Sequence, residues 1–300
     1  MERCSKLVWL ALLIPALGAA ELRAGELKVY ISADMEGVAG VVTEDQLGPS
    51  GFEYERFREL MTREVLAVIW AARECGATSF VVSDAHGNGE NLLIDLFPPD
   101  VRVVRGGPRR LSMMAGIDST FAAAILIGYH ASTTSPRGTR AHTFSSARIA
   151  GISVNGQPIP EAAFSAAIAG HFGVPVVMMA GDDAALAEAR QFLGDIEYAE
   201  TKKTLGFHAA LTLTPEAARS ILAQKTKAAL RRLASIPPFR FREPLRMTIT
   251  FKHYRPAEIL SLLPFFQRLD SHTISFTAEN ILQASDCLLF ITSYSFDLQP

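Results

Sequence analysis

The sequence predicts an α/β fold: a mostly parallel sheet flanked by helices, with a smaller α+β part towards the C-terminus. Short apolar segments alternate with helical patterns through the first two thirds of the chain, which is typical of a parallel sheet. The last hundred residues lose this alternation. Hydrophobic residues make up 49% of the 300 residues and charged residues 20%, which is the balance of an ordinary globular protein.

The first 24 residues have the pattern of a secretory signal peptide. Arg3 and Lys6 precede an apolar run at residues 7–20, and small residues lie at its end. A charged start, a short apolar segment and a small-residue exit are typical of such a signal. We therefore expect a periplasmic or secreted mature protein with no stable membrane anchor after signal removal. An uncleaved N-terminal anchor is the alternative, although a membrane span needs about 20 apolar residues.

The charge and the cysteines exclude some classes of function. The net charge is −2 and no long basic run occurs, so we expect no nucleic-acid partner. After the signal, Cys75 and Cys287 remain, each in an apolar segment, and two buried thiols are expected rather than a disulfide. The sequence has no Cys-x-x-Cys motif, which argues against thiolate metal binding.

Short apolar segments build the first half of the expected sheet. Residues 27–33 are apolar and rich in β-formers, which predicts a buried strand. Apolar side chains at helical spacing from Phe57 to Val68 predict a helix that ends at Gly76. Further strands are expected at residues 78–83, 101–104 and 122–127.

Capped helices and short strands continue the pattern after residue 145. Residues 149–154 alternate and end at Asn155-Gly156, which predicts a hairpin. Glu161 opens a helix to about residue 170, and Asp182 caps one that ends near Gly194. The remaining expected elements are strands at 174–179, near 247–251 and near 273–276, and helices from Thr214 and at the C-terminus. We expect a catalytic α/β domain over 26–195 and a smaller α+β domain over 196–300.

Acidic and histidine side chains follow three of the predicted strands. Asp34 and Glu36 follow the first strand, and His86 and His130 each follow a later one by about three residues. Ligands of open parallel sheets gather at the carboxyl ends of strands, so we expect these side chains to meet. Carboxylates with imidazoles suit Zn, Mn or Fe better than Mg or Ca. Each group taken alone also fits a solvated turn or a structural histidine.

An ordered set of motifs resembles peptidase family M55, the D-aminopeptidases. The resemblance begins at Ser32-Ala33-Asp34-Met35-Glu36-Gly37 and covers nearly all of the expected mature chain. It continues in Asp84-Ala85-His86, Gly128-Tyr129-His130, His142, Glu161 and Ala180-Gly181-Asp182-Asp183. The whole set in this order is far more specific than the first motif alone. The family members are cytoplasmic, so the export signal departs from the pattern.

The resemblance implies a binuclear zinc centre with two Zn²⁺ per chain. Asp34 would bridge the ions. Glu36 and His86 would complete one shell, and His130 and Glu161 the other. It also implies that His142 is the catalytic histidine. Short peptides with N-terminal D-residues would be the substrates, and the chains would form a homo-decamer of two stacked five-membered rings around an inner chamber.

A histidine beside two metal ions can move protons during peptide hydrolysis. Because imidazole titrates near neutral pH, we expect His142 to act as acid/base or as a donor to the transition state. An ordinary loop histidine would have no such role. Two other functions fit the same residues: a binuclear amidase or esterase of other specificity, and a secreted protein that binds peptides or metals without turnover.

Overall fold

A seven-stranded, mostly parallel sheet forms the larger part of the structure. The computed structural model describes residues 27–294, so the expected signal peptide at 1–24 lies outside the described residues. The sheet has the order β3-β2-β1-β4-β7-β8-β9, and every neighbouring pair is parallel except β8 and β9. Its strands are β1 (Leu27–Ala33), β2 (Ala77–Asp84), β3 (Val101–Val104), β4 (Ala123–Tyr129), β7 (Val176–Asp182), β8 (Glu197–Gly206) and β9 (Ala209–Thr212).

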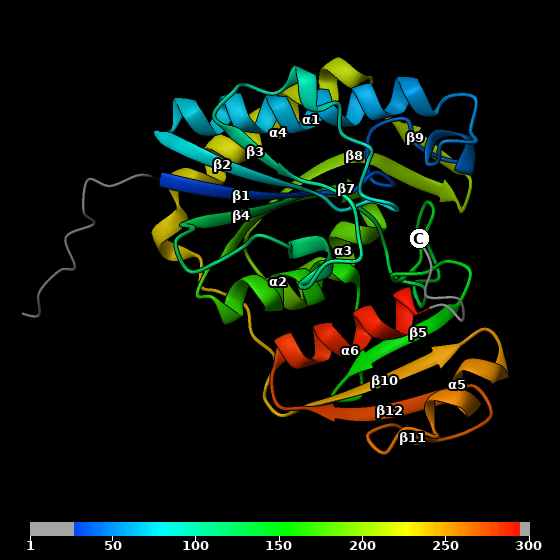
Figure 1. The fold of residues 1–300 in the computed structure, drawn as a ribbon. Coiled ribbons are helices and arrows are strands. Elements are labelled where there is room, and N and C mark those ends of the chain that lie inside the picture. Colours follow the sequence, from blue (N-terminus) through cyan, green and yellow to red (C-terminus); the bar gives the residue numbers. More distant parts are fainter. Residues whose placement is uncertain (1–26, 295–300) are drawn as a thin grey trace, which may run out of the picture.

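Four helices cover the two faces of this sheet. On one face, α1 (Tyr54–Glu74) packs beside α4 (Pro215–Arg231), and on the other lie α2 (Glu161–His171) and α3 (Asp183–Leu193) (Figure 1). The central strands β4 and β7 are buried along their whole length. Strands covered on both sides read as continuous apolar runs, which is why the sequence predicts them well.

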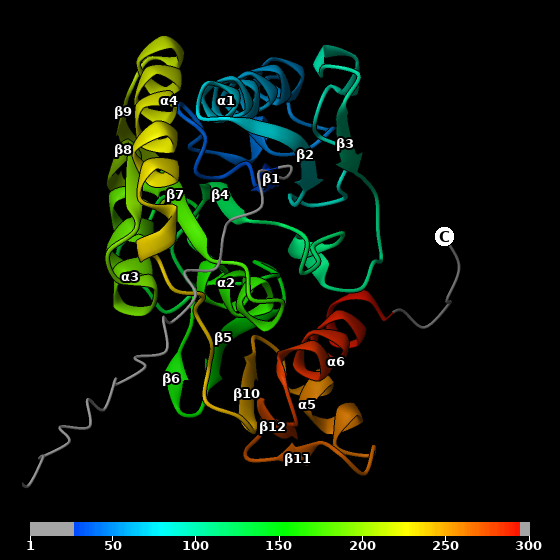
Figure 2. The same ribbon diagram turned by 90° about the vertical axis from the view of Figure 1, so that its left-hand side faces the viewer.

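A five-stranded antiparallel sheet forms the smaller part. Its order is β11-β12-β10-β5-β6. Helix α6 (Ile281–Ser293) packs on β10 and β12 and also contacts α2, so it lies between the two parts (Figures 1 and 2). The other elements are β5 (Ile149–Val154), β6 (Gln157–Pro158), β10 (Leu245–Phe251), α5 (Tyr254–Leu260), β11 (Gln267–Arg268) and β12 (Thr273–Ala278).

The predicted fold class is confirmed, but the two sheets do not divide the chain at residue 195. The larger sheet takes β8 and β9 from beyond that point, and the smaller sheet takes β5 and β6 from before it. Where independent folding units begin and end therefore stays a prediction. Within residues 27–294, no helix is long and apolar enough to span a bilayer. Cys75 and Cys287 are free thiols, each half-buried.

Candidate metal centre

The carboxyl ends of β1, β2 and β4 bring the predicted ligands to one edge of the larger sheet. Asp34 directly follows β1, and its backbone N–H donates to the carbonyl of Ile127 at 2.8 Å. His86 lies two residues beyond β2, and His130 directly follows β4. Parallel strands end at a common edge, so residues nearly a hundred positions apart in the sequence become neighbours.

Two glycines allow the loops after β1 and β4 to touch. A methyl group on Gly37 would overlap the backbone of Gly128 and Tyr129, and one on Gly128 would overlap the carbonyl of Asp34. Gly128 also has a φ of +72°, a conformation that side chains disfavour. The close contact between these backbones sets the distance between Asp34 and His130.

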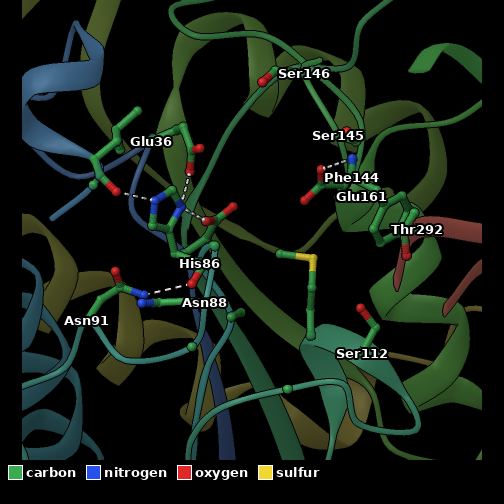
Figure 3. Close-up of a pocket in the computed structure, with 18 of the residues that line it drawn as sticks. Glu36, His86, Asn88, Asn91, Ser112, Phe144, Ser145, Ser146, Glu161 and Thr292 are labelled. Carbon is green, nitrogen blue, oxygen red and sulfur yellow. Dashed lines mark hydrogen bonds and ion pairs between the residues drawn. The ribbon is translucent and has the colours of Figure 1, made fainter. Parts of the chain in front are cut away.

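Asp34 lies between two acid–histidine pairs. The side chains of the first pair, Glu36 and His86, point toward each other in Figure 3. One oxygen of Asp34 is 3.2 Å from His86 Nδ1, which is also 2.9 Å from Glu36 Oε2. Its other oxygen is 3.4 Å from His130 Nε2, which is 3.5 Å from Glu161 Oε2. All five side chains are almost fully inaccessible to solvent. The structure therefore brings together all five predicted ligands, with Asp34 central.

Backbone carbonyls fix the orientation of all three histidine rings. His86 Nε2 is 2.8 Å from the carbonyl of Leu47, His130 Nδ1 is 3.0 Å from that of Ala131, and His142 Nδ1 is 2.9 Å from that of Arg140. A carbonyl only accepts hydrogen bonds, so each of these nitrogens carries the proton. The other nitrogen of each ring faces the carboxylates, and when it carries no proton its lone pair is available to a metal ion. Metal-binding histidines are oriented in this way.

The cluster contains buried polar atoms that have no hydrogen-bond partner and that a cation would satisfy. Asp34 Oδ2 and His130 Nε2 are buried and have no hydrogen-bond partner. Ligand atoms of Asp34, Glu36 and His86 lie within 4.8 Å of one another, and so do those of Asp34, His130 and Glu161. Buried polar atoms are almost always paired, and buried carboxylates need compensating charge. The residues present fit a divalent metal ion such as zinc.

The surrounding charges shift the pKa values of the cluster. Burial, and then the neighbouring charge of Glu36, raise the pKa of Asp34 well above its usual range. Burial alone would lower the pKa of His86 and of His130, but the adjacent carboxylates outweigh it and raise both well above the ordinary value. In each case the carboxylates favour a positive charge at the histidine position, which is what a bound cation would supply.

Glu161 and His142 complete the cluster from the side of the smaller sheet. Glu161 is the first residue of α2 and accepts a hydrogen bond from the backbone N–H of Phe144. The His142 ring stacks on His130, with centroids 4.0 Å apart. His142 Nε2 is 3.8 Å from Glu36 Oε1 and 4.0 Å from Glu161 Oε1. Burial, and then the charge of His130, lower the pKa of His142.

Asp84, the last residue of β2, stabilises the turn that carries His86. Among the described residues, it makes no hydrogen bond to the His86 imidazole. Its carboxylate accepts from the backbone N–H groups of Asn91 and Leu92, at 2.6 and 2.7 Å, and from Asn91 Nδ2 at 2.7 Å. Asn91 Nδ2 also donates to the carbonyl of His86 at 2.7 Å, and Tyr54 donates to Asn91 Oδ1. Asp84 therefore caps the turn that follows β2. Asn91 and Tyr54 carry no sequence signal of this role.

A cavity of about 830 Å³ opens onto the cluster. It is lined by both parts of the molecule: Leu289 and Thr292 of α6 contribute to its wall together with the turn after β2 and the segment around Ser145. Thr292, Asn88 and Ser145 are seen around it in Figure 3. A space of this size is in the range of small-ligand sites. Its side chains are mixed polar and apolar, so it suits a partly polar ligand better than a purely apolar one.

Comparisons with known proteins agree with this geometry. The family model for D-aminopeptidases of peptidase family M55 matches residues 27–290. A D-aminopeptidase of Bacillus subtilis (strain 168) is 32% identical over 270 residues, which are 89% of this chain and 97% of the relative. The solved structure of the Zn-dependent D-aminopeptidase DppA from Bacillus subtilis, described as a self-compartmentalizing protease, superposes with a TM-score of 0.85 and 31% identity, over 90% of this chain and 99% of that one. The chain therefore belongs to the D-aminopeptidase family M55.

Proposed function

We propose that this protein is a zinc-dependent D-aminopeptidase that holds two zinc ions per chain. The observation that carries the proposal is the orientation of the histidines: one nitrogen of each ring bonds to a backbone carbonyl, and the other faces a buried group of carboxylates. Asp34 would contribute an oxygen to each ion. Glu36 and His86 would hold one ion, and His130 and Glu161 the other. Imidazole with carboxylate is a donor set that zinc accepts readily.

His142 is the residue in this site best placed to move a proton. When bound, the zinc ions would lower the pKa of a water molecule to about 7 and polarise the scissile carbonyl. Both His142 and His130 line the cavity, but the His142 side chain is 17% exposed and that of His130 only 1%, so His142 is the more accessible to a substrate. Its Nε2 can accept the proton of the attacking water and deliver it to the leaving amine.

The size of the cavity supports short peptides as the substrates. Its volume of about 830 Å³ excludes a folded domain but accommodates a few residues. Membership of the family supports an N-terminal D-residue in the substrate. The relative described as self-compartmentalizing supports an assembly, and we propose a homo-decamer of two five-membered rings. We further propose that the mature protein is periplasmic or secreted. Sedimentation of the purified protein would test the assembly, and a mass near that of one chain would contradict it.

Metal analysis combined with a peptide screen tests the proposed function. We expect two zinc ions per chain and hydrolysis of D-aminoacyl peptides in preference to their L-isomers. EDTA should abolish this activity, and Zn²⁺ or Mn²⁺ should restore it. Full activity after verified metal removal would contradict the two-metal site. Peptide binding without turnover would favour a secreted binding protein, and turnover of other amides or esters alone would favour an amidase or esterase.

A further inference from the structure

The loop that carries Glu36 is buried but has no regular secondary structure. It runs over residues 36–41, of which all but Gly40 are buried. Buried carbonyl groups outside helices and strands need donors from elsewhere in the molecule. Since Glu36 points into the metal centre from this loop, whatever satisfies these carbonyls also determines where its carboxylate lies.

Lys202 of β8 supplies three of these donors. Its side chain is 1% exposed, and its Nζ donates to the carbonyls of Glu36, Val38 (3.0 Å) and Val41 (2.6 Å). A lysine ammonium has three N–H donors. All three are therefore used within one loop of six residues, across more than 160 positions of sequence.

Neighbouring side chains hold the rest of the loop. Thr201 Oγ1 donates to the carbonyl of Gly37 at 2.6 Å, and Glu64 Oε1 accepts from the N–H of Ala39 at 3.0 Å. Each makes a single bond to the loop, whereas Lys202 makes three and spans it from end to end. Lys202 is also the residue whose side chain bonds to the backbone of Glu36 itself.

We propose that Lys202 is a positioning residue of the metal centre: it fixes the backbone at Glu36 and so holds that carboxylate in place for the ion shared with His86. The inference rests on the proposed two-metal site. Lys202 lies outside the cavity lining, so it acts through Glu36 and not on the substrate. Removing residues that orient metal ligands typically costs about 10- to 100-fold in metal affinity, and we expect that range here for one of the two ions.

The zinc affinity of the Lys202→Met variant tests this positioning role. Methionine is apolar and of similar length, so it removes the three donors with little change in volume. We expect the variant to hold one zinc ion with wild-type affinity and a second about 10- to 100-fold more weakly, measured by competition with a chelator. The kcat at limiting zinc should fall with zinc occupancy while KM stays near its wild-type value. A merely structural lysine would lower the melting temperature and leave both affinities unchanged.

Two further variants make the result decisive. Lys225→Met is the matched control, because Lys225 of α4 is partly buried but pairs with Glu197 at 2.9 Å and has no described hydrogen bond to the loop at 36–41. This variant should retain both ions. Lys202→Gln keeps two donors, so it should fold if the methionine variant does not, and its loss of affinity should be the smaller of the two.

The wild-type measurement separates the two proposals. Fewer than two zinc ions in the wild-type protein would contradict the proposed function, and with it the inference that depends on it. Two ions in the wild type and unchanged affinity for both in a folded Lys202 variant would overturn the role of Lys202 alone.

Discussion

Replacing His142 with alanine should stop turnover without removing zinc. His142 Nε2 lies 3.8 Å from Glu36 and 4.0 Å from Glu161, beyond hydrogen-bond range, so neither carboxylate depends on it for its position. A positioned acid or base contributes about 10²–10⁴ in rate, or about 3–5 kcal/mol of transition-state stabilisation. We therefore expect kcat to fall by about 10²–10⁴ while zinc content stays at two ions per chain.

The assay combines steady-state kinetics on a D-aminoacyl dipeptide with metal analysis of the same sample. His253→Ala is a suitable control, because His253 is exposed and lies at the start of α5, away from the cluster. Loss of a zinc ion in the His142 variant would refute the reasoning. It would make His142 a ligand, which its distance from Glu36 and His130 also allows. A fall in kcat of less than about tenfold would refute the proton-transfer role as well.

The pH dependence of kcat/KM is a second test of the proton-transfer role of His142. Burial and then the charge of His130 lower the pKa of His142 from the ordinary 6.5. Its Nε2 therefore stays unprotonated as the pH falls through 6.5, and the acid limb of kcat/KM should lie below that value. This limb should disappear from the residual activity of His142→Ala.

Two further substitutions probe the structure around the site. Gly128→Ala should cost about 3 kcal/mol or more of unfolding free energy and lower zinc affinity, because the added methyl group overlaps the Asp34 carbonyl. The control Gly173→Ala, at a similar φ of +79° in open space, should cost only about 1–2 kcal/mol. Both costs are measured by denaturant titration, and equal costs would contradict the overlap at Gly128. Burial raises the pKa of Glu64 from 4.5 to about 7, so the folded protein holds a proton that the unfolded chain has released. The unfolding free energy should therefore fall by about 3 kcal/mol as the pH rises from about 4.5 to 7. Glu64→Gln keeps the acceptor for Ala39 and should flatten this dependence; an unchanged slope would show that Glu64 is not its source.

Local patterns predicted the strands that bear the site because those strands are short, apolar and central. The strand expected at 122–127 extends over Ala123–Tyr129, and the helix expected from Glu161 ends at His171. The Asn155-Gly156 turn forms the predicted hairpin, with positive φ at both residues. These features depend on side chains only a few positions apart.

Contacts between distant segments could not be predicted in the same way. Residues 149–154 form the expected strand, but nothing within that strand tells which of two sheets it joins. Lys202 is one of two adjacent lysines in β8, and its burial follows only from the position of the loop at 36–41. Asn91 likewise matters through the folded shape of the turn after β2.

Because of the path of the chain between His142 and Glu161, the position of these two site residues depends on both sheets. Between these two residues the backbone leaves the parallel layer, forms the β5–β6 hairpin at one edge of the other sheet, and returns to begin α2. Truncating the protein before β10 would leave this hairpin without its neighbouring strand and would remove α6, which contributes to the cavity wall. We therefore expect a gene fragment that ends at residue 195 to yield a protein with an unprotected strand edge and an incomplete cavity wall.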